Sequence, residues 1–275
     1  MLKQRARPIE VSGQPTFERP DSQMVSAAQI YEPAFAKWAQ YFDNPICLDR
    51  KTWEYCYIAQ AIDSYAGLTP GKRGLCFGAG KEFLPAIFAS RGVEIVATDW
   101  MNQDHDWQTK AKNDLFFPHL VEQEPFDRLV SLTEVDMNNI PSDLSGFDFI
   151  WSTGCLEHIG SHRNGMAFVE NAMSCLKPGG IAVHTTEFTI SSRTVSQDVP
   201  ELSFYCEQDI RELATRLTEQ GHLIVLNFQR GDTIADMHVD TPPYRKGMTL
   251  AAHFSTHIIT SIGLIVQKDG IARFD

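Results

Sequence analysis

The chain has 275 residues, of which 43% are hydrophobic and 21% are charged. This length suits one large domain, or one domain with a small cap, and it is ample for a hydrophobic core. The 24 Lys and Arg against 35 Asp and Glu give a formal net charge of -11. The acidic balance therefore argues against nucleic acid or an anionic membrane as the main partner.

The cysteines and the N-terminus bear on the cellular compartment. The six cysteines form no CxxC pair, which argues against a zinc site and a disulfide framework and favours reduced thiols. The first eight residues are basic but precede no apolar stretch, so no signal peptide is expected. No window approaches the roughly 20 apolar residues of a membrane span. We therefore expect a cytoplasmic protein without a membrane span.

The N-terminal part of the chain predicts an arm followed by helices. The first 25 or so residues carry turn formers without periodicity and predict a flexible lead-in. Apolar and aromatic residues then recur at helical spacing over residues 27–41 and again over residues 49–65. Thr69-Pro70-Gly71 ends the second helix. We expect residues 1–66 to form an arm and a helical cap, and residues 67–275 to form the main domain.

Beyond residue 70 the pattern changes to short apolar runs that alternate with helices. Strands are predicted at residues 74–77, 93–98, 129–135, 147–152, 181–186, 223–228 and 258–267, and helices at 82–91, 166–176 and 207–220. Such alternation indicates βαβ units and a parallel sheet with helices on both faces. The fold class is α/β, a Rossmann-like, doubly wound and mostly parallel sheet of seven strands. Little helix separates the last two strands, which predicts an antiparallel hairpin at one edge.

A glycine turn after the first of these strands indicates a nucleotide-like ligand. The strand runs into Phe77-Gly78-Ala79-Gly80, where the two glycines permit a sharp turn and a close approach to a ligand. The second strand ends at Asp99, about 20 residues later, where a carboxylate can accept hydrogen bonds from both hydroxyls of a ribose. A dinucleotide site would need a third glycine where Phe83 stands. An adenosine-type cofactor other than NAD is therefore favoured.

Five motifs in order carry a family resemblance. They are Gly74-Leu75-Cys76-Phe77-Gly78-Ala79-Gly80, Val96-Ala97-Thr98-Asp99, Val135-Asp136-Met137, Phe147-Asp148-Phe149-Ile150-Trp151-Ser152 and Leu176-Lys177-Pro178-Gly179-Gly180. Over roughly residues 70–190 this series resembles the class I S-adenosylmethionine (SAM)-dependent methyltransferases. The resemblance implies SAM as cofactor. It also implies that the cofactor-binding residues are Phe77, Gly78, Ala79, Gly80, Asp99, Trp100, Asp136, Met137, Thr153 and Gly154.

Within that resemblance the residues have different roles. The loop that contains Gly78 and Gly80 would pack against the methionine and ribose of SAM, and Asp99 would bind the ribose hydroxyls. Asp136 would contact the adenine amino group, and Met137 would pack on the adenine ring. Residues 152–154 would line the sulfonium side. Two positions depart from the family pattern, because Cys76 replaces an acidic residue and Glu82 replaces a small one. Glu82 or a residue of the N-terminal helices would then hold the methionine amino group.

A narrower resemblance concerns the acceptor. It is carried by residues 50–55, Cys155-Leu156-Glu157-His158-Ile159-Gly160-Ser161, His184-Thr185-Thr186-Glu187-Phe188 and residues 260–265. These stretches look like those of a bacterial subgroup of methyltransferases found among surface-glycan biosynthesis enzymes. The resemblance implies a sugar or another small hydroxylated acceptor.

Two residues are candidates for catalysis. His158 directly follows the fourth strand, and an imidazole there can take a proton from an acceptor hydroxyl because its pKa lies near neutrality. The alternative is a helix-start histidine bonded to backbone. Glu187 lies near the carboxyl end of the fifth strand, where it could orient His158 or bind an acceptor hydroxyl, whereas His184 faces the opposite side. No metal is expected, because Gly154 interrupts a Glu-x-x-Glu-His spacing.

Three residues are candidates for substrate binding. Arg50 and Trp53 lie on the second predicted helix, which we expect to close over the cofactor. Tyr244 lies in a proline-rich stretch within residues 229–255 that is either a lid or a plain surface loop.

The favoured function is SAM-dependent O-methylation of a glycan, its nucleotide-linked precursor or another small hydroxylated acceptor. N- or C-methylation of a small metabolite, and a SAM-binding regulatory protein without activity, stay open. The sequence does not determine the oligomeric state.

Overall fold

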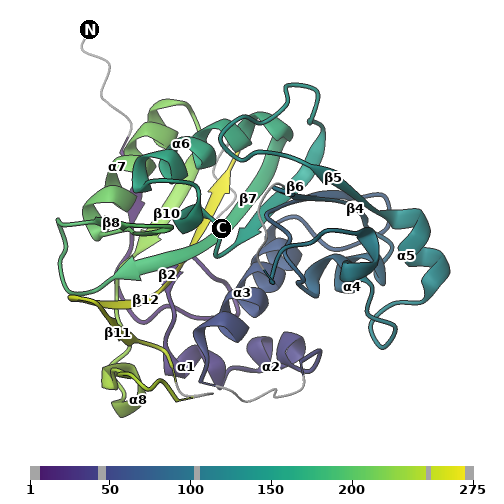
Figure 1. Cartoon of the computed structure of the whole chain (residues 1–275). Coiled ribbons are helices and arrows are strands. Elements are labelled where there is room, and N and C mark those ends of the chain that lie inside the picture. The colour runs from purple at the N-terminus through teal and green to yellow at the C-terminus, as the bar shows by residue number, and fades with distance from the viewer. Residues whose placement is uncertain (1–6, 43–47, 102–105, 246–248, 270–275) are drawn as a thin grey trace, which may run out of the picture.

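A central sheet organises the chain in the computed structural model (Figure 1), which describes residues 7–42, 48–101, 106–245 and 249–269. The sheet has ten strands, nine of them in the order β1-β10-β2-β12-β7-β6-β3-β4-β5, and β11 pairs with β12 outside this path. The doubly wound, mostly parallel α/β fold with an antiparallel edge is thereby confirmed.

One half of the sheet is parallel and comes from the strand–helix alternation in the sequence. Its strands are β3 (Arg73–Phe77), β4 (Glu94–Asp99), β5 (Val130–Glu134), β6 (Phe147–Thr153) and β7 (Leu176–Thr189). Chain order reverses between β3 and β6, which pair in register from Gly74↔Phe149 to Phe77↔Ser152. Ligands of such sheets bind at this reversal, outside the carboxyl ends of the strands.

The other half of the sheet contains the antiparallel strand. β12 (His257–Gln267) runs antiparallel to β7, from Ile259↔Thr189 to Gln267↔Ile181. β10 (Leu223–Asn227) pairs with β12 only at Leu223 and Ile224. Beyond that point a further strand, β2 (Ser22–Met24), lies between the two.

The N-terminal segment is part of this sheet and not a flexible lead-in. β2 (Ser22–Met24) is buried, pairs parallel with β10 and antiparallel with β12, and so satisfies the backbone groups that these strands leave unpaired where they diverge. β1 (Ile9–Glu10) pairs with the outer side of β10. The described part of the expected arm or flexible lead-in therefore contributes two strands to the sheet, which the sequence did not predict because strands of two or three residues carry almost no periodic signal.

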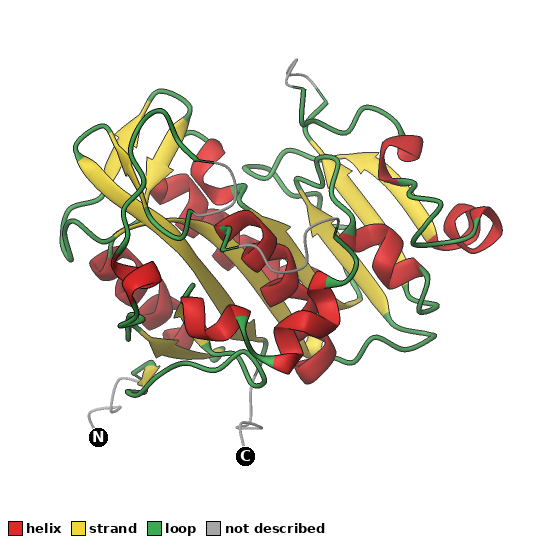
Figure 2. Ribbon diagram, turned by 90° about the horizontal axis from the view of Figure 1, so that it is seen from below, coloured by secondary structure: helices red, strands yellow, loops and turns green. Residues whose placement is uncertain are grey.

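Helices cover both faces of the sheet (Figures 1 and 2). α1 (Ala27–Ile30), α2 (Pro33–Ala39), α3 (Arg50–Tyr65) and α4 (Leu84–Ala89) share one hydrophobic cluster with sheet residues such as Trp151 and Val183. α6 (His162–Ala172) and α7 (Glu207–Glu219) share a second cluster with Ile150 and Ala182. α5 (Gln123–Leu129) precedes β5.

Short elements surround the carboxyl-end edge of the sheet. Those that follow the carboxyl ends of β6, β7 and β10 or precede the antiparallel β12 are η2 (Leu156–His158), β8 (Gln197–Val199), β9 (Leu202–Phe204), α8 (Ile234–Met237) and β11 (Ala252–Phe254). Two other short elements are η1 (Lys112–Leu115), in the connection from β4 to α5, and η3 (Met173–Cys175), which leads into the amino end of β7. The Arg50 N–H donates to the Thr249 carbonyl at 3.1 Å, so the stretch expected as a lid contacts the start of α3. Lys246 of that stretch lies outside the described residues.

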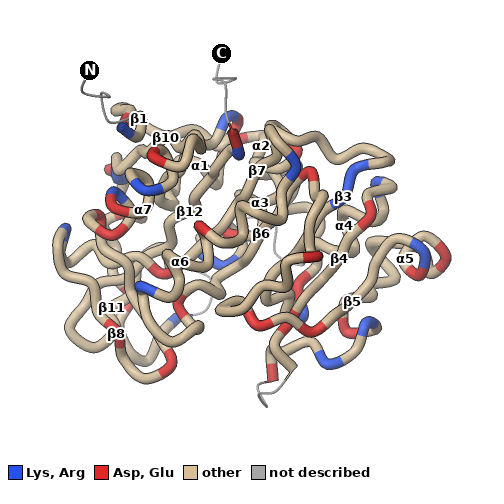
Figure 3. Tube along the Cα trace, turned by 90° about the horizontal axis from the view of Figure 1, so that it is seen from above, with Lys and Arg blue, Asp and Glu red and all other residues tan. Residues whose placement is uncertain are grey.

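Figure 3 shows acidic and basic residues interspersed on the face that it presents. Within the described ranges, no helix is both long and apolar enough to cross a bilayer.

Candidate functional site

The turn after β3 has the sequence Phe77-Gly78-Ala79-Gly80, and we call this turn the cradle. Gly78 and Gly80 have φ of +60° and +51°, a conformation that glycine adopts without steric cost. A Cβ on Gly78 would lie 2.6 Å from Cys155 Sγ, so a side chain does not fit there. The Ala79 N–H donates to the Thr98 carbonyl at 2.8 Å and holds the turn against β4. The turn thus offers backbone groups to a ligand at close range.

Asp99 ends β4 against this turn. Its Oδ2 accepts hydrogen bonds from the N–H groups of Gly80 at 3.0 Å and Thr109 at 2.9 Å, and its Oδ1 accepts from the Trp100 N–H at 2.8 Å. Burial raises the pKa of Asp99, and these three donors oppose the increase. The carboxylate therefore lies at the glycine turn, where the resemblance places the ribose.

We expect Asp99→Ala to weaken SAM binding by about 1.5–3 kcal/mol, the worth of a hydrogen bond to a charged group. Isothermal calorimetry measures the dissociation constant, and circular dichroism checks the fold. Asp143→Ala is the matched control, because Asp143 is an exposed carboxylate in the loop before β6. Equal affinity of the two variants would remove Asp99 from the cofactor site.

Asp136 and Met137 lie beside the same turn. The Val135 N–H donates to the Asp99 carbonyl at 3.1 Å, which joins the end of β5 to the end of β4. Met137 is buried, and its Sδ lies 3.7 Å from the position of a Cβ on Gly78. Asp136 Oδ1 accepts from the Asn138 N–H at 2.8 Å and caps the following turn. The structure therefore places Met137 against Gly78, whereas the Asp136 side chain is bound within its own turn.

Glu82 lies beneath the cradle and explains the two departures from the family pattern. Its Oε1 accepts from Trp151 Nε1 at 2.6 Å and from Cys76 Sγ at 3.2 Å, and its Oε2 accepts from Thr153 Oγ1 at 2.7 Å. Burial raises the pKa of Glu82 to about 7, although these donors and Lys51 lower it. A carboxyl group therefore lies within hydrogen-bond distance of the Cys76 thiol, at the strand position where the resemblance expects an acidic residue.

Five charged residues meet at the carboxyl ends of β6 and β7, and we call Arg50, Lys51, Glu54, Glu157 and Glu187 the charged cluster. Lys51 Nζ lies 2.7 Å from Glu54 Oε2, and the Arg50 guanidinium pairs with the Glu187 carboxylate. Three carboxylates therefore face two cations. Both cations come from the first turn of α3, which Asp49 caps through the Thr52 N–H.

Hydroxyl groups of the sheet complete the charged cluster. Thr186 Oγ1 donates to Glu157 Oε2 at 2.8 Å, and Thr185 Oγ1 lies 3.3 Å from Glu54 Oε2. Ser261 Oγ of β12 donates to Glu54 Oε1. A Cβ on Gly154 would lie 3.3 Å from both Glu157 Oε1 and Glu54 Oε2. The charged cluster is therefore next to the loop after β6, which leads back to the cradle.

His158 lies at the rim of this region. Its Nδ1 is 2.7 Å from the Glu201 carbonyl, which can only accept, so Nδ1 is assigned the proton and Nε2 is left as an acceptor. The Trp107 ring centroid is 6.5 Å from the His158 ring, and Trp107 is 61% exposed. The Trp107 carbonyl lies 3.1 Å from a Cβ position on Gly80, so the backbone of Trp107 lies against the glycine turn.

Glu187 and His158 have different partners. Glu187 pairs with Arg50, whereas His158 bonds to the backbone of the turn between β8 and β9, so the structure gives no support to Glu187 as the residue that orients His158. His184 lies on the other face of β7, where its Nδ1 is 2.8 Å from Ser152 Oγ. Burial lowers the pKa of His184 to about 3, which keeps it neutral.

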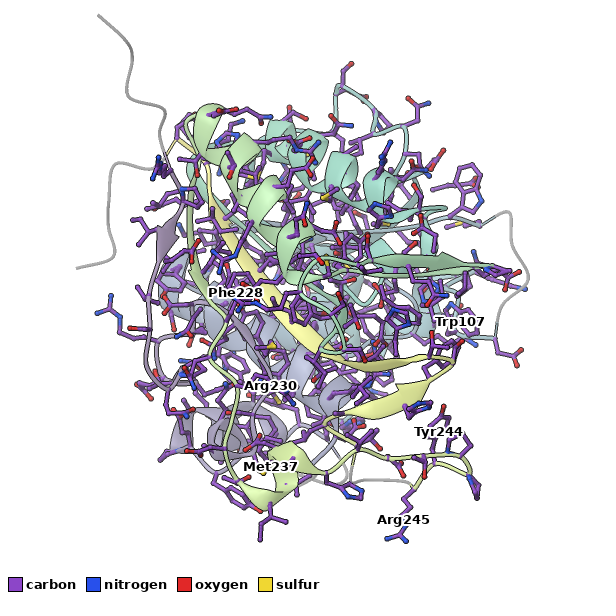
Figure 4. The ribbon with its side chains drawn as sticks, turned by 90° about the vertical axis from the view of Figure 1, so that its left-hand side faces the viewer. Trp107, Phe228, Arg230, Met237, Tyr244 and Arg245 are labelled. Atoms are coloured by element: carbon purple, nitrogen blue, oxygen red, sulfur yellow. The ribbon has the colours of Figure 1, made fainter. Side chains whose placement is uncertain are left out.

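The structure places the three candidates for substrate binding in different parts of the molecule. Arg50 belongs to the charged cluster. Trp53 is 0% exposed and donates from Nε1 to Gln29 Oε1 at 2.7 Å, so its assignment to the substrate is corrected to the core. The half-exposed Tyr244 donates to the His253 carbonyl at 2.9 Å, which ties its loop to β11. Figure 4 shows Tyr244 on the same side of the molecule as Trp107.

A cavity of about 330 Å³ lies apart from the cradle, between the end of β7 and the start of α7. Phe188, Arg193, Phe228 and Arg230 line it, the last two being labelled in Figure 4. Its lining includes no residue of the cradle or the charged cluster. Among the described residues, no group of three or more His, Cys, Asp or Glu is arranged to hold a metal ion.

Sequence reasoning missed Glu157 and gave Glu54 no definite role. The available signals were a glutamate on the buried side of an aromatic helix and a glutamate directly before His158. Neither signal shows that the two carboxylates lie on either side of the same glycine.

Comparisons with known proteins agree with this architecture. The family model of a methyltransferase domain matches residues 51–267. No curated protein matches the sequence significantly. A Galdieria sulphuraria protein assigned as a sarcosine dimethylglycine methyltransferase is 15% identical with a TM-score of 0.52, over 80% of this chain and 89% of that one.

Two further solved structures are similar at lower scores. A Methanosarcina mazei SAM-dependent methyltransferase is 16% identical with a TM-score of 0.49, over 75% of this chain and 96% of that one. The [4+2]-cyclase SpnF is 17% identical with a TM-score of 0.45 over 62% of this chain, which spans 58% of that protein. The family model covers most of the chain, and S-adenosyl-L-methionine is the expected cofactor. The chain belongs to the methyltransferase-domain family, as a SAM-dependent methyltransferase.

Proposed function

We propose that this protein transfers the methyl group of SAM to a hydroxyl of a small polar acceptor, with a sugar or a glycan unit as the acceptor class. The observation that carries the proposal is the charged cluster, which lies against Gly154 beside the glycine cradle. It combines carboxylates, cations and hydroxyls within one small volume. Such mixed polar groups suit an acceptor that presents several hydroxyls.

The residues of the cradle fit SAM. Gly78 and Gly80 allow the sharp turn after β3 at φ of +60° and +51°, and Asp99 supplies a carboxylate beside that turn, at the position proposed for the ribose. Glu82 Oε2 accepts one hydrogen bond, from Thr153, and keeps a lone pair for a second donor such as the methionine ammonium. SAM would supply an electrophilic methyl group, which leaves alignment and proton removal to the protein.

The charge of the site narrows the acceptor class. Three carboxylates of the charged cluster face two cations, and Asp99 and Glu82 add further acidic groups nearby. Both cations of the charged cluster are already paired with carboxylates, Arg50 with Glu187 and Lys51 with Glu54, so neither is left to bind a phosphate or carboxylate of the acceptor. This pairing favours a neutral polyol over a nucleotide-linked sugar. The Glu157 carboxyl group, which can also accept a proton from an amine, makes an amine the second candidate acceptor.

A labelled-methyl assay distinguishes these classes. The purified protein is incubated with methyl-labelled SAM and, separately, with neutral hexoses and inositol, with hexose phosphates, and with primary amines of similar size. We expect label on the neutral polyols. Label on the amines alone would replace O-methylation by N-methylation. Tight SAM binding without transfer to any probe would indicate a SAM-binding protein without activity.

A further inference from the structure

We propose that Glu157 is the base that removes the proton from the acceptor hydroxyl, a role that rests on the proposed O-methylation. In this step the new O–CH3 bond forms as the S–CH3 bond breaks, and that electron pair stays on the sulfur of the leaving S-adenosylhomocysteine. The acceptor O–H bond breaks, its electron pair stays on oxygen, and Glu157 Oε1 takes the proton.

The first argument is position. Glu157 is 3% exposed, and Oε1 lies 3.3 Å from the position of a Cβ on Gly154, a glycine with φ of +58°. Gly154 ends the loop that the family resemblance places at the sulfonium. Oε2 is fixed by the hydrogen bond from Thr186 Oγ1 at 2.8 Å, so Oε1 is the oxygen on the Gly154 side, where Lys51 Nζ is the atom nearest to that Cβ position.

The second argument is the charge balance. Glu54 has Lys51 and Glu187 has Arg50, whereas Glu157 forms no ion pair within the described part of the chain. The titratable and charged groups that face it are Arg50, Lys51 and Glu54 of α3, Glu187 of β7, Tyr205 after β9 and the adjacent Cys155. If the three carboxylates of the charged cluster hold one proton among them, Glu157 is the residue that carries it, because Glu54 and Glu187 are each paired with a cation.

The neighbours of Glu157 determine the direction in which its pKa is shifted. Burial and the Glu187 carboxylate raise the pKa of Glu157 to about 8, and Lys51 opposes the increase. A base with a pKa near the working pH accepts a proton efficiently and still releases it to water after the product leaves. His158, the base predicted from sequence, is exposed and held at the rim by the Glu201 carbonyl.

The test compares Glu157→Gln, His158→Asn and the surface control Glu134→Gln, with the neutral polyol that the wild-type protein methylates. We expect Glu157→Gln to lower kcat by roughly 10²–10⁴-fold, with the SAM dissociation constant within a few-fold of wild type. The wild-type kcat should rise with pH to a plateau above about 8, and this rise should be absent in Glu157→Gln.

A readout independent of turnover completes the test. With carbon-13-labelled glutamate, one side-chain carboxyl resonance of the wild-type protein should titrate near pH 8 and be missing in Glu157→Gln. Loss of turnover in His158→Asn with near-wild-type turnover in Glu157→Gln would overturn the assignment and leave O-methylation intact. A wild-type protein that binds SAM but methylates no hydroxyl would overturn both.

Discussion

Trp53→Ala is expected to lower the free energy of unfolding by about 3–5 kcal/mol, the cost of truncating a large aromatic side chain in a close-packed core. Trp53 is fully buried between the N-terminal helices and stacks on Tyr57, with ring centroids 4.7 Å apart. The truncation also leaves the buried Gln29 amide oxygen without the indole donor that now lies 2.7 Å away. Urea unfolding followed by circular dichroism measures the change.

Two variants control this result. Trp107→Ala removes an indole that is 61% exposed and should change the free energy of unfolding by no more than about 0.5 kcal/mol. Trp53→Phe keeps most of the packing and should lose about 1–3 kcal/mol, mainly through the unpaired amide of Gln29. If Trp53→Ala left stability unchanged and raised the KM of the acceptor, Trp53 would be a substrate contact after all.

Gly78→Ala is expected to weaken SAM binding about 10–100-fold while the protein stays folded. A side chain at φ of +60° costs of order 1–3 kcal/mol, and the new Cβ would meet Cys155 Sγ at 2.6 Å. The Cys155 Sγ lies 3.3 Å from both the Gly78 and Thr153 carbonyl oxygens, between which its single S–H donor can be shared. The turn must therefore move, and the cradle changes shape. Calorimetry with SAM measures the loss.

The control separates strain from cradle geometry. Gly179→Ala has the same kind of backbone strain at φ of +76°, but nothing lies within 4 Å of its new Cβ. It should lower stability slightly and leave SAM affinity unchanged. Adding Cys155→Ala to Gly78→Ala removes the sulfur from the collision and should restore part of the affinity. Unchanged SAM binding in Gly78→Ala alone would show that the turn does not carry the cofactor.

Local sequence patterns predicted the parallel half of the fold, because each βαβ unit is local in sequence. Strand β4 was expected at residues 93–98 and is found at Glu94–Asp99, with Asp99 at its end beside the glycine turn. The boundaries of β7 were less accurate. Residues 177–180 contain Pro178 and two glycines and read as a helix stop, yet they belong to β7. The strand passes through them where its pairing with β6 shifts register between Phe147 and Phe149.

By itself, the sequence determined the fold class, the glycine turn after β3 and the position of Asp99 at the end of β4, because these depend on residues within one strand–turn–helix unit and its successor. Only the tertiary structure decided that β2 enters the sheet, that Trp53 belongs to the core, and that Glu54, Glu157 and Glu187 share one cluster. Arg50 and Glu187 are 137 residues apart, and Glu54 and Ser261 are 207 residues apart. Strand order and register across the sheet bring such residues together, and a one-residue change of register would turn their side chains to the opposite face.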